Sequence, residues 1–230
     1  MKTTHNTGTK DLRDELVNIY FSKILLKGYP RNKTRVSKSL IRNIIEGKAK
    51  RVAFPPYRLP ISLKGKGTTA ISNLCQDIYD FYNTKPLVSQ ADFDKWFNQV
   101  ANNFISATGG STSFGNAQKI INITLKHLYA YTSKKKIENF KYCHFTLDDI
   151  TYGGFYKYHL NKGTSFYKKE INTTKLTKKW TTINEEEYYS IQEEIREYFY
   201  SRRRCFYQDG IGQNLTPFEA EIVIWTEYKK

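Results

Sequence analysis

The chain has 230 residues, and its 37 Lys and Arg against 22 Asp and Glu give a formal net charge of +15. Hydrophobic residues make up 39% of the chain and aromatic residues 15%, which is enough for a buried core and argues against an intrinsically disordered protein. No apolar run reaches the roughly 20 residues that span a bilayer, and the first residues lack the apolar stretch of a secretory signal. We therefore expect a cytoplasmic protein that does not contact membranes.

The three cysteines, Cys75, Cys143 and Cys205, are widely separated and form no Cys-x-x-Cys pair. Their odd number and their spacing argue against a disulfide framework and against a structural zinc site. The sequence therefore favours a reducing compartment, and nothing in it predicts a bound metal or another cofactor.

Two helices are predicted near the N-terminus. The first covers residues 10–27, with Thr9 as a possible N-cap, and ends at Gly28. The second covers residues 37–51, where apolar residues recur at helical spacing and basic residues such as Arg42 project elsewhere. This second helix is expected to have one apolar face and one cationic face.

Two further helices are predicted in the next part of the chain. Thr68 or Thr69 is expected to cap the third helix, which ends before Pro86. Ser89 is expected to cap the fourth helix, with Asp92 three residues on, close to the positive end of the helix dipole.

A fifth helix is predicted at residues 114–132, after a loop with Ser111, Thr112 and Ser113. It carries an apolar stripe that we expect to face the core and a polar stripe that we expect to face solvent. The apolar stripe is formed by Ala117, Ile121, Leu125 and Leu128, and the polar stripe by Lys119, Asn122 and Lys126.

The C-terminal part begins with an ambiguous segment around residues 140–180, which mixes aromatic and Thr residues with glycines. It could hold a short helix from Leu147 or a small hairpin around Gly153 and Gly154. A helix is then predicted over residues 184–199, where Asn184 and Glu187 match a capping box.

A last helix is expected from Thr216 as N-cap, with Pro217 at its first position and Glu219 at its third. The sequence as a whole predicts a mainly α-helical protein. Residues 1–230 are expected to form a single multi-helix domain with a basic N-terminal third, residues 16–75, and a small irregular or β-hairpin segment around 140–180.

Charge is segregated along the chain. Residues 16–75 contain thirteen Lys and Arg and one acid, Glu46, whereas residues 184–199 contain six Glu and one Arg. Like charges that repel one another are usually neutralised by a partner, and the commonest partner for such a basic stretch is a phosphate backbone.

The sequence thus favours a protein of a bacterium or a mobile element that binds DNA or RNA through its phosphates. Eleven basic residues are candidates for these contacts: Arg31, Lys33, Arg35, Lys38, Arg42, Lys48, Lys50, Arg51, Arg58, Lys64 and Lys66. Two segments add free backbone amides at a helix start, one around Lys64 and Lys66 and one at residues 108–119.

Two other functions stay open. The first is a small nuclease of a phage or a host defence system, although its carboxylates do not form a recognisable motif. The fragments considered are Glu46 with Lys48, the group His144, Asp148, Asp149, His159 and Asn161, and the pair Glu219 and Glu221. The second is an interaction or inhibitor protein that docks its cationic side on an acidic protein.

Overall fold

The computed structural model of the chain describes residues 36–52, 66–84, 87, 89–132, 138, 140–148, 151, 180–201 and 216–228. The described residues form six α-helices and a 3-10 turn, η3, and they contain no β-strand. The elements are α2 (Lys38–Val52), α3 (Lys66–Asn83), α4 (Gln90–Ala107), α5 (Phe114–Tyr131), η3 (Trp180–Thr182), α7 (Glu185–Ser201) and α8 (Pro217–Tyr228).

The prediction of a mainly α-helical, multi-helix domain is confirmed for the described residues. The helix expected at 10–27 and the hairpin expected around Gly153 and Gly154 lie outside them, and whether residues 1–230 form one domain stays a prediction. The short helix considered from Leu147 stays a prediction, because Thr151 is helical but residues 149–150 and 152–179 lie outside the described ones.

Local capping chemistry sets most helix starts as predicted. The Ser89 hydroxyl accepts the Asp92 N–H, and the Ser113 hydroxyl accepts the Asn116 N–H. At the start of α7, Asn184 Oδ1 accepts the Glu187 N–H at 2.9 Å. The Glu187 carboxylate accepts the Asn184 N–H in return, which completes the capping box.

Two further helix starts can be compared with the sequence. Thr216 and Glu219 form the same reciprocal pair at the start of α8. The expectation that Thr68 or Thr69 caps α3 is wrong, since α3 already begins at Lys66. Apolar periodicity, which starts at Ala70, does not show how far a polar first turn extends before it.

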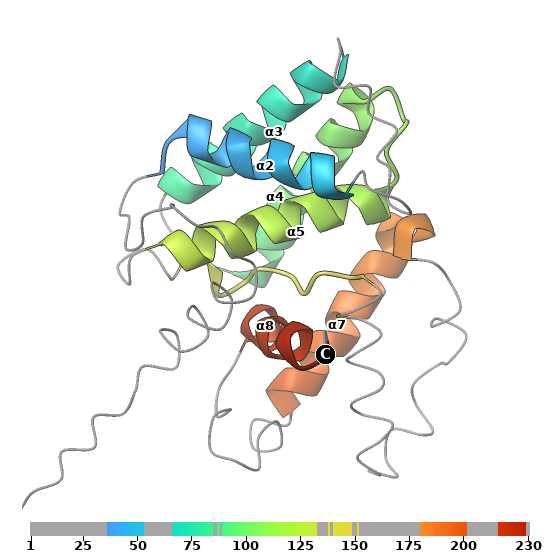
Figure 1. Cartoon of the computed structure of the whole chain (residues 1–230). Coiled ribbons are helices and arrows are strands. Elements are labelled where there is room, and N and C mark those ends of the chain that lie inside the picture. Colours follow the sequence, from blue (N-terminus) through green and yellow to red (C-terminus); the bar gives the residue numbers. More distant parts are fainter. Residues whose placement is uncertain are drawn as a thin grey trace, which may run out of the picture.

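Helix α5 lies at the centre of the fold. In Figure 1, α2 and α3 lie on one side of α5, and α7 and α8 lie on the other. Every residue of α5 except Asn116 and Ile123 is buried. The first turn of α5 is packed so closely that a Cβ on Gly115 would come within 2.0 Å of the Trp180 carbonyl oxygen.

The expectation that the polar stripe of α5 faces solvent is therefore wrong. Lys119, Asn122 and Lys126 are only 9%, 0% and 6% exposed. The stripe is covered by residues 140–148, which run past α5 toward α7 (Figure 1), and by side chains of α7 and α8. A helix that is enclosed on all sides has no solvent-facing stripe, whatever its periodicity.

Residues 143–147 are buried although they form neither helix nor strand, so their backbone groups need partners from side chains. Two glutamine amides provide them. Gln192 accepts the Phe145 N–H at 3.0 Å and donates to the Phe145 carbonyl at 2.6 Å. Gln118 accepts the Leu147 N–H at 3.3 Å and donates to the Leu147 carbonyl at 2.8 Å. Each amide thus replaces the two hydrogen bonds of a neighbouring strand.

Candidate functional site

Helix α2 carries the predicted cationic surface because its apolar residues fix its orientation. Ile41, Ile44 and Ile45 are buried in the core, where α2 packs on α3 and α5. Lys38 is exposed and Arg42 is half-buried, one turn further along the helix. Residues at this spacing lie on the same side of a helix, so the two cations share one surface.

Both cations contact the neighbouring helix α3. Lys38 Nζ donates to Gln76 Oε1 and lies 5.1 Å from the centre of the Tyr79 ring. Arg42 donates through Nη2 to Ser72 Oγ at 3.0 Å. The surface that Lys38 and Arg42 present is therefore made jointly by α2 and α3.

The described part of this surface is mixed in sign. Arg42 Nε forms an ion pair with Glu46 at 3.0 Å. On α3, Gln76 donates to both carboxylate oxygens of Asp80 at 2.7 Å. Burial and the charge of Asp80 raise the pKa of Asp77. Acids of α2 and α3 thus lie among the predicted phosphate-binding cations.

The other nine candidates have no described side chains. Four belong to described helices by their backbone only, namely Lys48, Lys50, Arg51 and Lys66. Five lie outside the described residues altogether, namely Arg31, Lys33, Arg35, Arg58 and Lys64. The structure therefore brings Lys38 and Arg42 together and does not test the remaining positions.

The acidic helix α7 is not placed against α2. The two helices lie on opposite sides of α5 in Figure 1. The first glutamate of α7, Glu185, instead accepts hydrogen bonds from Asn98 at 2.6 Å and from Asn102 at 3.1 Å, both on α4. Segregation of charge along the sequence is thus accompanied by separation of the two helices in space.

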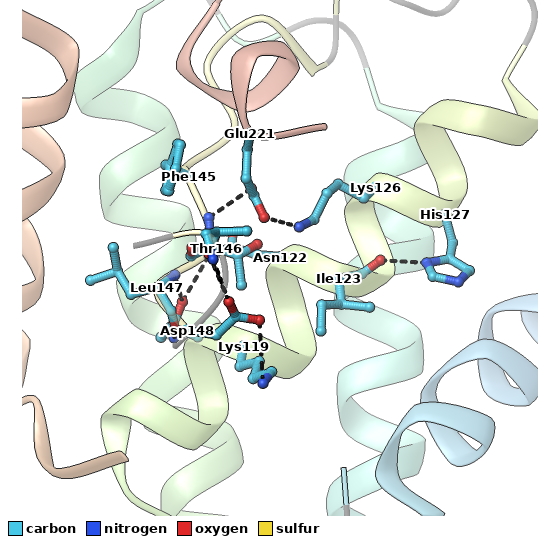
Figure 2. Close-up of polar contacts among 12 residues, drawn as sticks. Lys119, Asn122, Ile123, Lys126, His127, Phe145, Thr146, Leu147, Asp148 and Glu221 are labelled. Atoms are coloured by element: carbon cyan, nitrogen blue, oxygen red, sulfur yellow. Dashed lines mark hydrogen bonds and ion pairs between the residues drawn. The ribbon is translucent and has the colours of Figure 1, made fainter. Parts of the chain in front are cut away.

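A second group of charged residues lies inside the fold, along the polar stripe of α5 (Figure 2). Lys119 lies 3.4 Å from Asp148 and 4.3 Å from the centre of the Trp180 ring. The Asp148 carboxylate also accepts the Thr151 N–H at 2.8 Å. Because the charges of Lys119 and Lys126 and the hydrogen bonds from Thr151 outweigh burial, the pKa of Asp148 is lower than usual.

The second lysine of this stripe pairs with the C-terminal helix. Lys126 Nζ contacts the carboxylate of Glu221, and the other oxygen of that carboxylate accepts the Thr146 N–H at 2.8 Å. Figure 2 shows Glu221 entering from α8 toward Lys126 of α5. No local pattern indicates these pairs, because the partners are far apart along the chain. The one usable signal was that α5 has two lysines and no Asp or Glu of its own.

His144 belongs to a hydrogen-bonded chain in the aromatic part of the core. Its Nε2 lies 2.7 Å from Asp94 Oδ1, its Nδ1 lies 3.0 Å from the Tyr188 hydroxyl, and that hydroxyl accepts from Asn122 at 3.0 Å. Burial lowers the pKa of His144 despite the nearby Asp94 carboxylate. A neutral imidazole that donates to Asp94 and accepts from Tyr188 satisfies this arrangement.

The residues considered for a nuclease have structural contacts where they are described. Glu46 pairs with Arg42, Asp148 with Lys119 and Glu221 with Lys126, while the Glu219 carboxylate accepts the Thr216 N–H at the start of α8. Asp149, His159 and Asn161 lie outside the described residues. Among the residues that the structure describes, no three His, Cys, Asp or Glu side chains are grouped so as to hold a metal ion.

The two described cysteines, Cys75 and Cys143, are free and buried. Burial raises the pKa of Cys75 to about 11 and that of Cys143 well above its usual range. Both are therefore protonated thiols at neutral pH, which does not suit a nucleophile.

None of the described helices is both long and apolar enough to span a membrane. Comparisons with protein-family models, with curated proteins and with solved structures found no match to this chain.

Proposed function

We propose that the protein binds nucleic acid, DNA or RNA, mainly through phosphate contacts made by its basic N-terminal third. The observation that carries the proposal is the imbalance of charge in residues 16–75, which contain thirteen Lys and Arg and one acid. A stretch of this kind attracts a polyanion through Coulomb interactions and through the release of condensed counterions.

The position of α2 supports this proposal. Its apolar residues are directed into the core, so Lys38 and Arg42 remain at the surface next to α3. The acidic helix α7 lies on the other side of α5 (Figure 1). Glu46 and Asp80 reduce the positive charge near Lys38 and Arg42, so most of the affinity must come from the other nine cations.

The test is the salt dependence of binding to fluorescent duplex and single-stranded DNA and RNA. If about half of the eleven cations contact phosphate, log K falls with log salt at a slope of about −4 to −5 for duplex DNA. A slope near zero for all four probes contradicts the proposal. Cleavage of any probe after Mg²⁺ is added would indicate a nuclease instead of a binding protein.

Charge variants locate the interface. Lys38→Ala is expected to reduce the slope by about 1 if Lys38 contacts a phosphate. The matched control is Lys95→Ala, because Lys95 is also exposed but belongs to α4. Equal effects of the two variants would mean that Lys38 makes no specific phosphate contact and acts only through the net charge of the protein.

A further inference from the structure

Two polar groups on the covered stripe of α5 have hydrogen-bonding capacity that the described residues do not use. Gln118, Asn122 and Lys126 follow one another at intervals of four residues and so form one row along the helix. Asn122 Oδ1 is buried and has no hydrogen-bond partner in the part of the chain that the structure describes. Lys126 Nζ has three N–H donors, and Glu221 is the partner found for it among the described residues.

The hydroxyl of Thr146 is a third such group, since Thr146 Oγ1 is buried and has no partner among the described residues. The place of residue 146 opposite the row follows from the backbone contacts on either side. At one end of the row, the Leu147 N–H donates a hydrogen bond to Gln118. At the other end, the Thr146 N–H donates to Glu221, which forms the ion pair with Lys126. Asn122 stands between these two contacts, and Figure 2 shows it in this position.

The charges at this place determine which molecule could bind there. The Lys126 ammonium opposes a cation, and the Glu221 carboxylate opposes an anion, because both charges are buried and weakly screened. The unused groups are an acceptor on Asn122, ammonium donors on Lys126 and a hydroxyl that can do either. A small neutral molecule that both donates and accepts hydrogen bonds is complementary to all three.

We infer that Asn122, Lys126 and Thr146 form an internal binding site for one water molecule at the junction of α5, residues 140–148 and α8. The water accepts from Lys126 Nζ, donates to Asn122 Oδ1 and shares a hydrogen bond with Thr146 Oγ1. Buried waters typically make about three such bonds to groups that would otherwise be unsatisfied. The water also provides Lys126 with a second partner, which a buried ion pair needs.

The first test is Thr146→Val, which keeps the shape of the side chain and removes its hydroxyl. With the water bound, this loss should raise the unfolding equilibrium constant about five-fold or more in urea denaturation. Thr124→Val calibrates the result, because the buried Thr124 hydroxyl donates to the Ile120 carbonyl at 2.7 Å within α5. A neutral or stabilising Thr146→Val would overturn the inference, since removing a hydroxyl with no partner costs nothing.

The second test does not depend on a variant that folds. A high-resolution crystal structure of the full chain should show a density peak within hydrogen-bond distance of Asn122 Oδ1, Lys126 Nζ and Thr146 Oγ1. Well-ordered side chains with no peak between them would overturn the inference, as would direct contact among the three groups.

Discussion

Lys126 of α5 and Glu221 of α8 form a buried ion pair between residues that are 95 positions apart in the sequence. Their side chains are 7% and 0% exposed. Since Glu221 also accepts the Thr146 N–H, one carboxylate connects α8 with both α5 and the buried segment that covers it. The position of the C-terminal helix therefore depends on a charge in the interior.

Removing one partner of this pair should destabilise the protein strongly. Lys126→Met leaves the Glu221 carboxylate buried without its counter-charge, at a cost of about 3–5 kcal/mol in the free energy of unfolding. The double variant Lys126→Met with Glu221→Met should lose less than this, because no isolated charge remains. Urea denaturation measures both variants.

The control for the ion pair is Lys141→Met, which removes the exposed pair between Lys141 and Glu138 and should change the urea midpoint little. A double variant whose loss equals the sum of the two single losses would show that Lys126 and Glu221 do not interact energetically.

A second prediction concerns the glutamine side chains that form hydrogen bonds with the backbone of the buried segment, residues 143–147. Gln192→Leu removes the hydrogen bonds that Gln192 makes to the buried N–H and the buried carbonyl of Phe145, and the loss of such a buried bond costs about 1–3 kcal/mol. Chemical denaturation should therefore show a large loss of stability. Glu193→Leu, at the adjacent exposed position of α7, should stay within about 0.5 kcal/mol of the parent. Comparable losses in both variants would contradict the role of Gln192.

Gly115 is predicted to tolerate no side chain. Gly115→Ala places a methyl group 2.0 Å from the Trp180 carbonyl oxygen and 3.1 Å from the Thr181 Cα, so α5 and η3 must separate. We expect a loss of about 3 kcal/mol or more, at the upper end of overpacking effects. Thermal or urea unfolding tests this expectation.

Gly110→Ala is the comparison for Gly115→Ala, because it has open space around it but a φ of +75°. Its cost comes from the backbone alone and should be about 1–2 kcal/mol. If Gly110→Ala were the more damaging change, the close approach of α5 and η3 would not be what requires a glycine at position 115.

Stability should fall in mildly acidic solution because of His144. Its pKa in the folded protein is below the ordinary value of 6.5, so between these two values the unfolded chain binds a proton that the folded protein does not. The stability from this residue is complete above pH 6.5 and is lost as the pH falls toward the folded pKa. His144→Gln should weaken this pH dependence in urea titrations between pH 8 and pH 5.

Asp94 should affect the stability of the protein at lower pH than His144 does. Burial raises its pKa, but the hydrogen bonds from His144 and Gln90 and the charge of Arg196 outweigh burial, so the folded pKa lies below 3.8. Its contribution to stability is present above pH 3.8 and is lost as the pH falls through the folded pKa.

A His144→Gln variant with an unchanged pH dependence above pH 5 would contradict the assignment of that pH dependence to His144.

Part of the candidate site could be predicted from the sequence. The basic residues of α2 and the apolar residues opposite them follow from helical periodicity, and the Arg42 and Glu46 pair follows from their spacing of four residues. The contacts of Lys38 with Gln76 and of Arg42 with Ser72 could not be predicted, because they depend on how α3 packs against α2.

The sequence by itself determined the described helices and most of their first residues, because capping and periodicity act between residues three or four apart. Ser89, Asn184 and Thr216 cap as their neighbours indicated, and Ser113 is the cap among the three hydroxyl residues that precede α5. Only the tertiary structure decided that the polar stripe of α5 is buried. Its counter-charges come from Asp148 and Glu221, 29 and 95 residues from their lysines, and no local pattern encodes contacts at such separations.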